Sequence, residues 1–175
     1  DVRAIWEAGR NGRDGSTDHP TRAFFREEYR LNRRIHRFAK PYVALLDGIT
    51  MGGGVGLSVH GSHRIVTEKT MFAMPETAIG LFPDVGATWF LTRCPDGIGT
   101  WLALTGARLK GADVLAADTA AHFVPSAAIP ALEAAIRAGT PVDAAVAAHR
   151  ADPGPGTLAP HLDTIRRCFG HGTVE

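Results

Sequence analysis

The sequence has 175 residues, of which 45% are hydrophobic and 21% charged, and its formal net charge is +1. This composition is typical of a soluble globular chain with one domain, and the near-neutral charge argues against nucleic acid or an anionic membrane as a partner. The two cysteines, Cys94 and Cys168, are too few for a disulfide framework. Their scarcity favours a reducing compartment, and we expect the cytoplasm. No run of about 18 apolar residues, the length that spans a bilayer, is present.

The first part of the chain predicts two helices joined by a loop. Residues 1–9 have a helical pattern, and residues 10–20 are polar and glycine-rich, which is typical of a mobile loop. A long helix is expected over residues 21–39. It ends there because a proline, Pro41, follows Lys40, and the residue before a proline disfavours the helical conformation.

Strands and short helices alternate over the rest of the chain. We expect strands at residues 42–46, 64–67, 71–74 and 122–124. We expect short helices at residues 84–92, 98–104, 112–117 and 161–169, and a glycine-rich turn at 48–56 that leads into a helix through about residue 60. This alternation is characteristic of the α/β class. Residues 1–125 are interpreted as a core and residues 126–175 as a helical C-terminal segment, interrupted by a proline- and glycine-rich loop.

The long predicted helix carries a carboxylate in an unusual place. Phe24, Leu31, Ile35 and Phe38 follow helical spacing and define an apolar stripe, and Glu28 falls on that stripe. A carboxylate on a face that points to the core needs a partner or a function. The alternative is that Glu28 lies at the edge of the stripe and pairs with a nearby arginine.

Three consecutive glycines, Gly52, Gly53 and Gly54, follow a predicted strand. Glycines let a backbone pass very close to a ligand, and the free N–H groups at a helix start can stabilise a developing oxyanion. The dinucleotide-binding fingerprint is not met, because Leu57 stands where its third glycine would fall. The alternative is a tight turn that packs against a neighbouring helix.

Two acids eight residues apart, Glu76 and Asp84, each follow a proline directly. Such acids can act in general acid/base catalysis if the fold turns both toward one cleft. Asp84 could instead be the N-cap of the next helix, and Glu76 a first-turn acid favoured by a helix dipole. Their spacing alone does not bring the two side chains together. The eight histidines are scattered without a metal-binding pattern, so no metal is expected.

Taken together, these motifs resemble the active-site blocks of the enoyl-CoA hydratase (crotonase) superfamily. Their amino-acid sequences are most similar to the 3-hydroxyisobutyryl-CoA hydrolase branch of that superfamily. The matching stretches are residues 25–32 (FREEYRLN), 40–44 (KPYVA), 52–54 (GGG), 74–76 (MPE), 80–86 (GLFPDVG), 103–106 (ALTG), 108–114 (RLKGADV) and 122–125 (HFVP). Each block alone is weak, but their order and combination are specific.

The resemblance implies an α/β spiral of ββα units, with N-terminal strands and a C-terminal helical region of that fold lying outside these 175 residues. It implies that Glu76 is the catalytic carboxylate, that Asp84 is the second acid, and that Glu28 contacts the substrate. The N–H of Gly53 would contribute to a thioester oxyanion hole, whose other N–H is expected from a stretch just before Asp1. Hydratases usually place a second glutamate where this sequence has Gly56.

The activity implied is hydrolysis of the thioester of 3-hydroxyisobutyryl-CoA, or of a similar short 3-hydroxyacyl-CoA, as in valine catabolism. The partner is the acyl-CoA substrate itself, so CoA arrives with the substrate and no separate cofactor is expected. A homo-oligomer, a trimer or hexamer as in the superfamily, is a further expectation. The alternatives are a hydratase or isomerase that acts on another acyl-CoA, or a fragment without catalytic activity.

Overall fold

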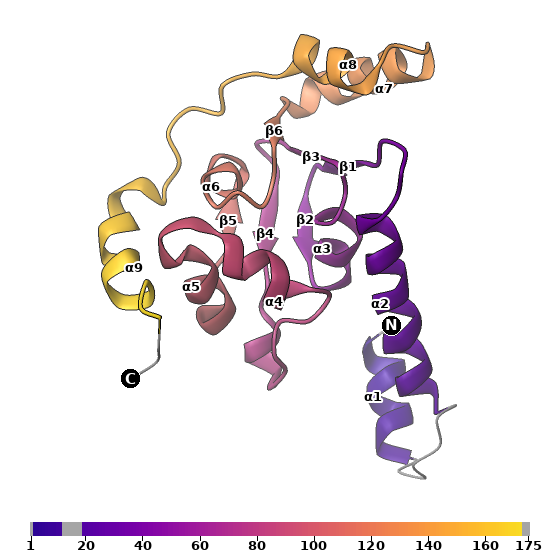
Figure 1. The fold of residues 1–175 in the computed structure, drawn as a ribbon, viewed down its shortest axis with the longest axis vertical. Coiled ribbons are helices and arrows are strands. Elements are labelled where there is room, and N and C mark those ends of the chain that lie inside the picture. The colour runs from indigo at the N-terminus through magenta and orange to yellow at the C-terminus, as the bar shows by residue number, and fades with distance from the viewer. Residues whose placement is uncertain (1, 12–18, 173–175) are drawn as a thin grey trace.

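A computed structural model of the chain describes residues 2–11 and 19–172. Two helices, α1 (Val2–Asn11) and α2 (Pro20–His36), lie side by side at one edge of the molecule (Figure 1). Both predicted helices are thereby confirmed, although α2 ends three residues before the predicted end. The predicted loop at residues 10–20 falls largely outside the described residues.

The described strands form two three-stranded sheets. In the first sheet β1 (Val43–Leu46), β3 (His63–Val66) and β6 (His122–Phe123) run parallel in the order β1-β3-β6. In the second sheet β2 (Ile49–Met51) runs parallel to β4 (Met71–Ala73), and β5 (Leu109–Lys110) pairs antiparallel with β4. The four predicted strands are confirmed. The two short strands β2 and β5 were not predicted, because tertiary pairing with β4 sets them and local propensity does not.

Short helices connect and cover the sheets (Figure 1). They are α3 (Gly53–Ser58), η1 (Glu76–Ile79), α4 (Ala87–Phe90), η2 (Leu91–Arg93), η3 (Pro95–Gly97), α5 (Ile98–Thr105) and α6 (Gly111–Ala116). The main core lies between these helices and the sheets, and its fully buried side chains include Phe72, Met74 and Leu102. The helices predicted at 98–104 and 112–117 are confirmed as α5 and α6.

The C-terminal part divides between two packing environments. After η4 (Ser126–Ala128), the helices α7 (Ile129–Arg137) and α8 (Val142–His149) pack together at one end of the molecule around a second, smaller apolar cluster. An extended stretch then leads through η5 (Ala159–His161) to α9 (Leu162–Phe169), which returns to pack on α5 in the main core (Figure 1). The domain boundary at residue 125 stays a prediction.

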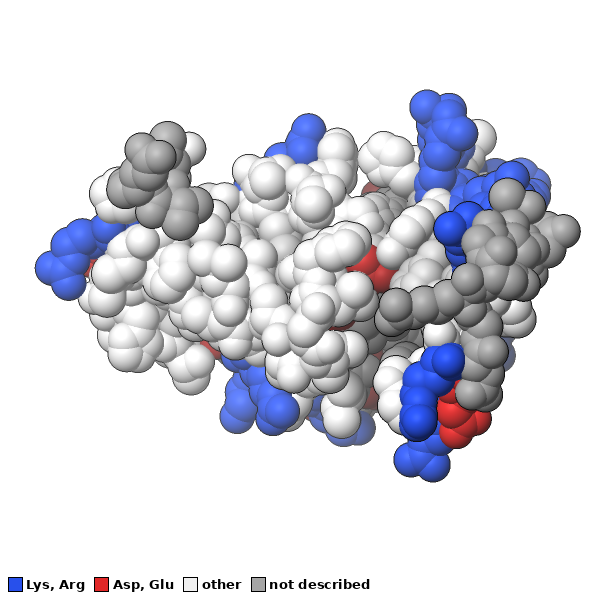
Figure 2. Space-filling view, turned by 90° about the horizontal axis from the view of Figure 1, so that it is seen from below, with Lys and Arg blue, Asp and Glu red and all other residues white. Residues whose placement is uncertain are grey.

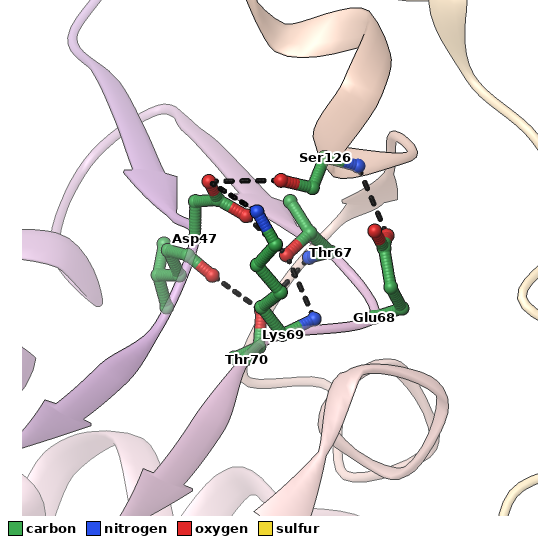
Figure 3. Close-up of polar contacts among 7 residues, drawn as sticks. Asp47, Thr67, Glu68, Lys69, Thr70 and Ser126 are labelled. Carbon is green, nitrogen blue, oxygen red and sulfur yellow. Dashed lines mark hydrogen bonds and ion pairs between the residues drawn. The ribbon is translucent and has the colours of Figure 1, made fainter.

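A polar network ties the end of β1 to the β3–β4 turn and to the start of η4 (Figure 3). Its members are Asp47, Thr67, Glu68, Lys69, Thr70 and Ser126. Asp47 accepts hydrogen bonds from Thr67 Oγ1 (2.7 Å) and Ser126 Oγ (3.0 Å), and Lys69 Nζ lies 4.0 Å from the carboxylate. The two hydroxyl donors, helped by Lys69, hold the pKa of Asp47 below its usual value. This network joins the core to the segment that begins at η4.

The parallel pairing of β2 with β4 places the motifs of interest at one sheet edge. Met51 is paired with Ala73, so the chain leaves both strands in the same direction. The glycine triplet follows β2, and Glu76 follows β4 after two residues. Of the helices that the structure describes, none combines the length and apolar character needed to cross a membrane.

Candidate active site

The glycine turn, which consists of residues 52–54 after β2, passes between the carboxylates of Glu28 and Glu76. Gly52 has a φ of +51°, a left-handed conformation that favours glycine, and α3 begins at Gly53. A Cβ atom added to Gly52 would lie 3.7 Å from Glu76 Oε1, and one added to Gly53 would lie 3.1 Å from Glu28 Oε1. The first N–H groups of a helix have no partner within the helix. The Gly53 N–H is therefore in a position where a ligand can accept from it.

Glu76 is a buried acid at the start of η1. Glu76 directly follows Pro75 in the segment after β4, and the residue is only 6% exposed. Among the described residues, its Oε2 atom has no hydrogen-bond partner. Burial raises the pKa of Glu76, and the charge of Asp84 raises it further. A buried carboxyl with an unpartnered oxygen and a raised proton affinity is what general acid/base chemistry uses.

Glu28 lies on α2 beside the glycine turn. Burial raises its pKa, and the charge of Asp84 adds to that effect. On the same helix, Arg30 forms an ion pair with Glu27, three residues away, at 2.8 Å. Glu28 and Gly53 both line a pocket of about 600 Å³ between α2 and α3.

The apolar stripe of α2 was only partly predicted correctly. Ile35 is buried, but Phe24, Leu31 and Phe38 are 37%, 45% and 47% exposed. Phe24 and Leu31 line the pocket beside Glu28 and do not enter the core. The helical period correctly identified one face of α2, but periodicity does not distinguish a face that packs on a core from one that borders a cavity.

Asp84 is not the N-cap of the following helix, so that alternative is wrong. Helix α4 begins at Ala87 with Gly86 as its N-cap, because Val85 and Gly86 both have a positive φ (+44° and +86°) and delay the helix. The Asp84 carboxylate instead accepts a hydrogen bond from Tyr29 Oη at 2.9 Å. Sequence analysis did not single out Tyr29, although it directly follows Glu28.

The Asp84 turn is strained and firmly held. A positive φ is unfavourable for a β-branched residue such as Val85 and persists only when the surroundings impose it. Here the Val85 side chain is 1% exposed, and His60 Nε2 donates a 2.7 Å hydrogen bond to the Val85 carbonyl. Burial lowers the pKa of His60, although the hydrogen bond to the Val85 carbonyl acts in the opposite direction. Strain of this kind is concentrated at functional sites.

The fold thus gathers Glu28, Glu76 and Asp84, here called the acid cluster, around the glycine turn. Asp84 acts electrostatically on both glutamates. Figure 2 shows the face at the bottom of Figure 1, which is mostly uncharged, with acidic side chains near its middle and Lys and Arg side chains around its rim. No three His, Cys, Asp or Glu side chains in the described part of the chain are arranged to hold a metal ion.

Position 56 has no room for a side chain. A Cβ atom at Gly56 would lie 2.8 Å from both Asn32 Nδ2 and Val85 Cβ, well inside normal contact distance. Asn32 Nδ2 also donates a 2.9 Å hydrogen bond to the Gly56 carbonyl. A glutamate at this position, the usual second acid of hydratases, is therefore incompatible with this packing.

The chain is similar in sequence to curated proteins with two different names. The chain is 52% identical over 185 residues to the mitochondrial 3-hydroxyisobutyryl-CoA hydrolase of Xenopus tropicalis, covering 100% of this chain and 47% of that protein. It is 51% identical over 146 residues to the small ribosomal subunit protein mS47 of Neurospora crassa, covering 82% and 28%. The chain spans about half the length of the curated hydrolases it matches along its full length.

The expected cytoplasmic location is contradicted by these relatives. The hydrolases, including the human one, are named as mitochondrial. The physical reason for the error is that scarce cysteines indicate a reducing environment only. They do not distinguish one reducing compartment from another.

The fold has a close structural counterpart. The crystal structure of a carnitinyl-CoA dehydratase from Mycobacterium thermoresistibile superimposes with a TM-score of 0.90 at 45% identity, covering 99% of this chain and 49% of that one. This likeness confirms the predicted crotonase-like α/β fold. The family model described as enoyl-CoA hydratase/isomerase matches residues 1–175. The chain therefore belongs to the enoyl-CoA hydratase/isomerase family.

Proposed function

We propose that the full-length protein hydrolyses the thioester of a short 3-hydroxyacyl-CoA, with 3-hydroxyisobutyryl-CoA as the substrate. The observation that carries this proposal is the closed position at Gly56, which cannot hold the second glutamate of hydratases. Asp84, in the turn between η1 and α4, supplies a second acid instead, as in the hydrolase branch that the sequence resembles. The 52% identity to a protein named as this hydrolase supports the same substrate.

In the proposed mechanism, the N–H of Gly53 polarises the thioester carbonyl. Glu76 either attacks the carbonyl carbon and expels the CoA thiolate to give a mixed anhydride, which water then hydrolyses, or takes a proton from a water that attacks the carbonyl carbon and displaces the CoA thiolate. The thiolate takes up a proton as it leaves. Asp84 and Glu28 orient the hydroxyl of the acyl group and shuttle protons during the reaction. The products are the free 3-hydroxy acid and the thiol of CoA. CoA belongs to the substrate, and we propose no further cofactor.

The names of the hydrolase relatives support a mitochondrial location for the full-length protein. A role in valine breakdown stays a proposal that follows from the proposed substrate. The expected trimer or hexamer stays a prediction. Light scattering on the full-length protein would test it.

The decisive experiment offers two substrates to the full-length protein. Release of free thiol from 3-hydroxyisobutyryl-CoA is measured with a thiol reagent, and hydration of crotonyl-CoA is measured by the loss of its enoyl absorbance. We expect thiol release without measurable hydration. Hydration without thiol release would contradict the proposal.

Two alternatives have specific support. The structural counterpart titled a dehydratase favours chemistry on an enoyl-CoA, and rapid hydration of crotonyl-CoA would establish it. The ribosomal relative favours a non-catalytic role. A folded full-length protein that is inactive on both substrates would support that reading. Glu76 argues against it, because a buried carboxylate oxygen without a partner among the described residues destabilises a fold that does not use it.

A further inference from the structure

Tyr29 occupies a distinctive place beside the acid cluster. It follows Glu28 on α2, and its hydroxyl donates a 2.9 Å hydrogen bond to Asp84 Oδ2 across 55 residues of sequence. Tyr29 is 40% exposed and Asp84 is half-buried, so a bound molecule can reach this pair of side chains. The ring packs on Phe25, with 5.8 Å between ring centroids. The backbone of α2 and this aromatic contact together fix the direction of the hydroxyl.

The donor and acceptor roles in this contact are fixed by chemistry. An ionised carboxylate only accepts hydrogen bonds, so the phenol must donate. Burial raises the pKa of Tyr29, and the hydrogen bond to Asp84 raises it further, which keeps the phenol protonated at neutral pH. With Oδ2 bonded to Tyr29, the Oδ1 atom of Asp84 is the one that remains for a ligand.

The Asp84 backbone is held by other groups. The buried side chain of Val85 and the hydrogen bond from His60 anchor the turn on the core side. Tyr29 contacts the carboxylate itself, at the exposed side of the turn. Loss of the Tyr29 hydroxyl therefore frees the rotamer of Asp84 and leaves the turn in place.

We propose that Tyr29 is a positioning residue that determines specificity for a hydroxyl on the acyl group. By holding Oδ2 of Asp84, it aims Oδ1 at that hydroxyl as a hydrogen-bond acceptor. This inference rests on the proposed thioesterase function and adds the reason why a 3-hydroxyacyl group is preferred over the same acyl group without the hydroxyl.

The test compares 3-hydroxyisobutyryl-CoA with isobutyryl-CoA, which has the same carbon skeleton without the hydroxyl. Thiol release is measured for the full-length wild type and for Tyr29→Phe, which keeps the ring and removes the hydroxyl. We expect kcat/KM for the hydroxylated substrate to fall about tenfold, the factor for one hydrogen bond, mainly through KM. The value for isobutyryl-CoA should change less than about twofold, so the preference for the hydroxyl should largely disappear.

Tyr42→Phe is the matched control, since Tyr42 is the other of the two tyrosines in this sequence. Tyr42 lies just before β1, with its ring against Gly61, which follows the end of α3 opposite to the glycine turn. This variant should leave both substrates unaffected. In an Asp84→Asn background, Tyr29→Phe should have little further effect on the ratio, because Tyr29 acts through Asp84.

An equal loss on both substrates in Tyr29→Phe, with the preference intact, would overturn the inference. An unfolded Tyr29→Phe protein, seen by circular dichroism, would overturn it as well, because the hydroxyl would then support the fold and not the carboxylate. A wild type that releases no thiol from either substrate would overturn the proposed function and this inference together. An active wild type with an unchanged ratio in the variant contradicts this inference alone.

Discussion

The molecule contains two groups of acids that differ in how the protein treats their charge. In the polar network, Asp47 receives two hydroxyl donors and lies near Lys69, and its pKa is lowered. In the acid cluster, Glu76 has a buried oxygen without a partner in the described residues, and its pKa is raised. Asp47 follows β1 and Glu76 follows β4, so position after a strand does not explain the difference.

The contrast shows how a structural acid can be distinguished from a reactive one. Hydrogen bonds that favour the charged form make a carboxylate unreactive and stabilising, as for Asp47. Burial and like charge do the opposite for Glu76, which destabilises the fold but prepares the acid for proton exchange or attack. Each of the following predictions tests one side of this contrast.

The largest effect is expected for Gly53→Val. The new side chain would approach Glu28 Oε1 and block access to the Gly53 N–H, and losing one oxyanion donor costs roughly 3 kcal/mol in the transition state. Thiol release should therefore fall by about two orders of magnitude or more, while the thermal unfolding midpoint changes little. Gly54→Ala is the matched control, since a Cβ there has only an ordinary 4.0 Å contact with Thr50. Full activity in a folded Gly53→Val protein would remove Gly53 from the site.

The second prediction concerns Glu76→Gln, which should lower thiol release by about a hundredfold, the scale for a positioned acid or base. The same variant should be more stable than the wild type at pH 7 by on the order of 1 kcal/mol, because it removes a buried charge. The raised pKa of Glu76 means that the charged form weakens the fold above that pKa. The gain should therefore disappear near pH 4, where the carboxyl is protonated. Denaturant unfolding at both pH values measures this, and a destabilised variant would contradict the contrast.

A change in the polar network should lower the stability of the fold and leave thiol release unchanged, the reverse of the result expected for Glu76→Gln. Asp47→Asn should lower the free energy of unfolding by about 1–2 kcal/mol, because the hydroxyl groups of Thr67 and Ser126 lose a charged acceptor. Activity should stay near that of the wild type. Since the folded-state pKa of Asp47 is lowered, its contribution is present above its unfolded pKa and is lost as the pH falls. If Asp47→Asn removes activity without loss of stability, the distinction between the two groups of acids fails.

The smallest effect is a shift in pH dependence. If Glu76 reacts as a carboxylate, kcat/KM should rise with pH through a pKa above the ordinary glutamate value of about 4.3. Asp84→Asn removes a neighbouring negative charge and should move this rising limb of the pH profile of kcat/KM to lower pH. Because burial is the larger cause of the raised pKa, the limb should remain above the ordinary value. A limb that moves upward would contradict the electrostatic coupling.

Much of the fold was predictable from the sequence because its elements have strong local signals. The stop of the long helix before Pro41 and the apolar runs of β1 and β4 were identified from single motifs. Strands β2 and β5 were missed, since two or three residues carry too little propensity and are set by pairing with β4. The helix predicted at 84–92 starts later, because a positive φ at Val85 is imposed by packing that no local rule contains.

For the candidate site, residue types were predictable but proximity was not. The glycine triplet and the two acids stood out by their chemistry, yet only the parallel pairing of β2 with β4 brings Glu76 beside Gly52. Glu28 stood out because it interrupts an apolar stripe. Tyr29 was missed, because a tyrosine on a helix carries no signal of a partner 55 residues away.

The closed position at Gly56 also limits how such a site can change over time. A single replacement of Gly56 by glutamate meets Asn32 on one side and Val85 on the other, so the chain cannot acquire a hydratase acid pair in one step. Asn32 would have to withdraw its contact to α3, and Val85 would have to leave the turn that carries Asp84. The three positions are therefore expected to change together, each tolerated only after the others. In engineering terms, converting one chemistry into the other requires rebuilding this junction before the new acid is introduced.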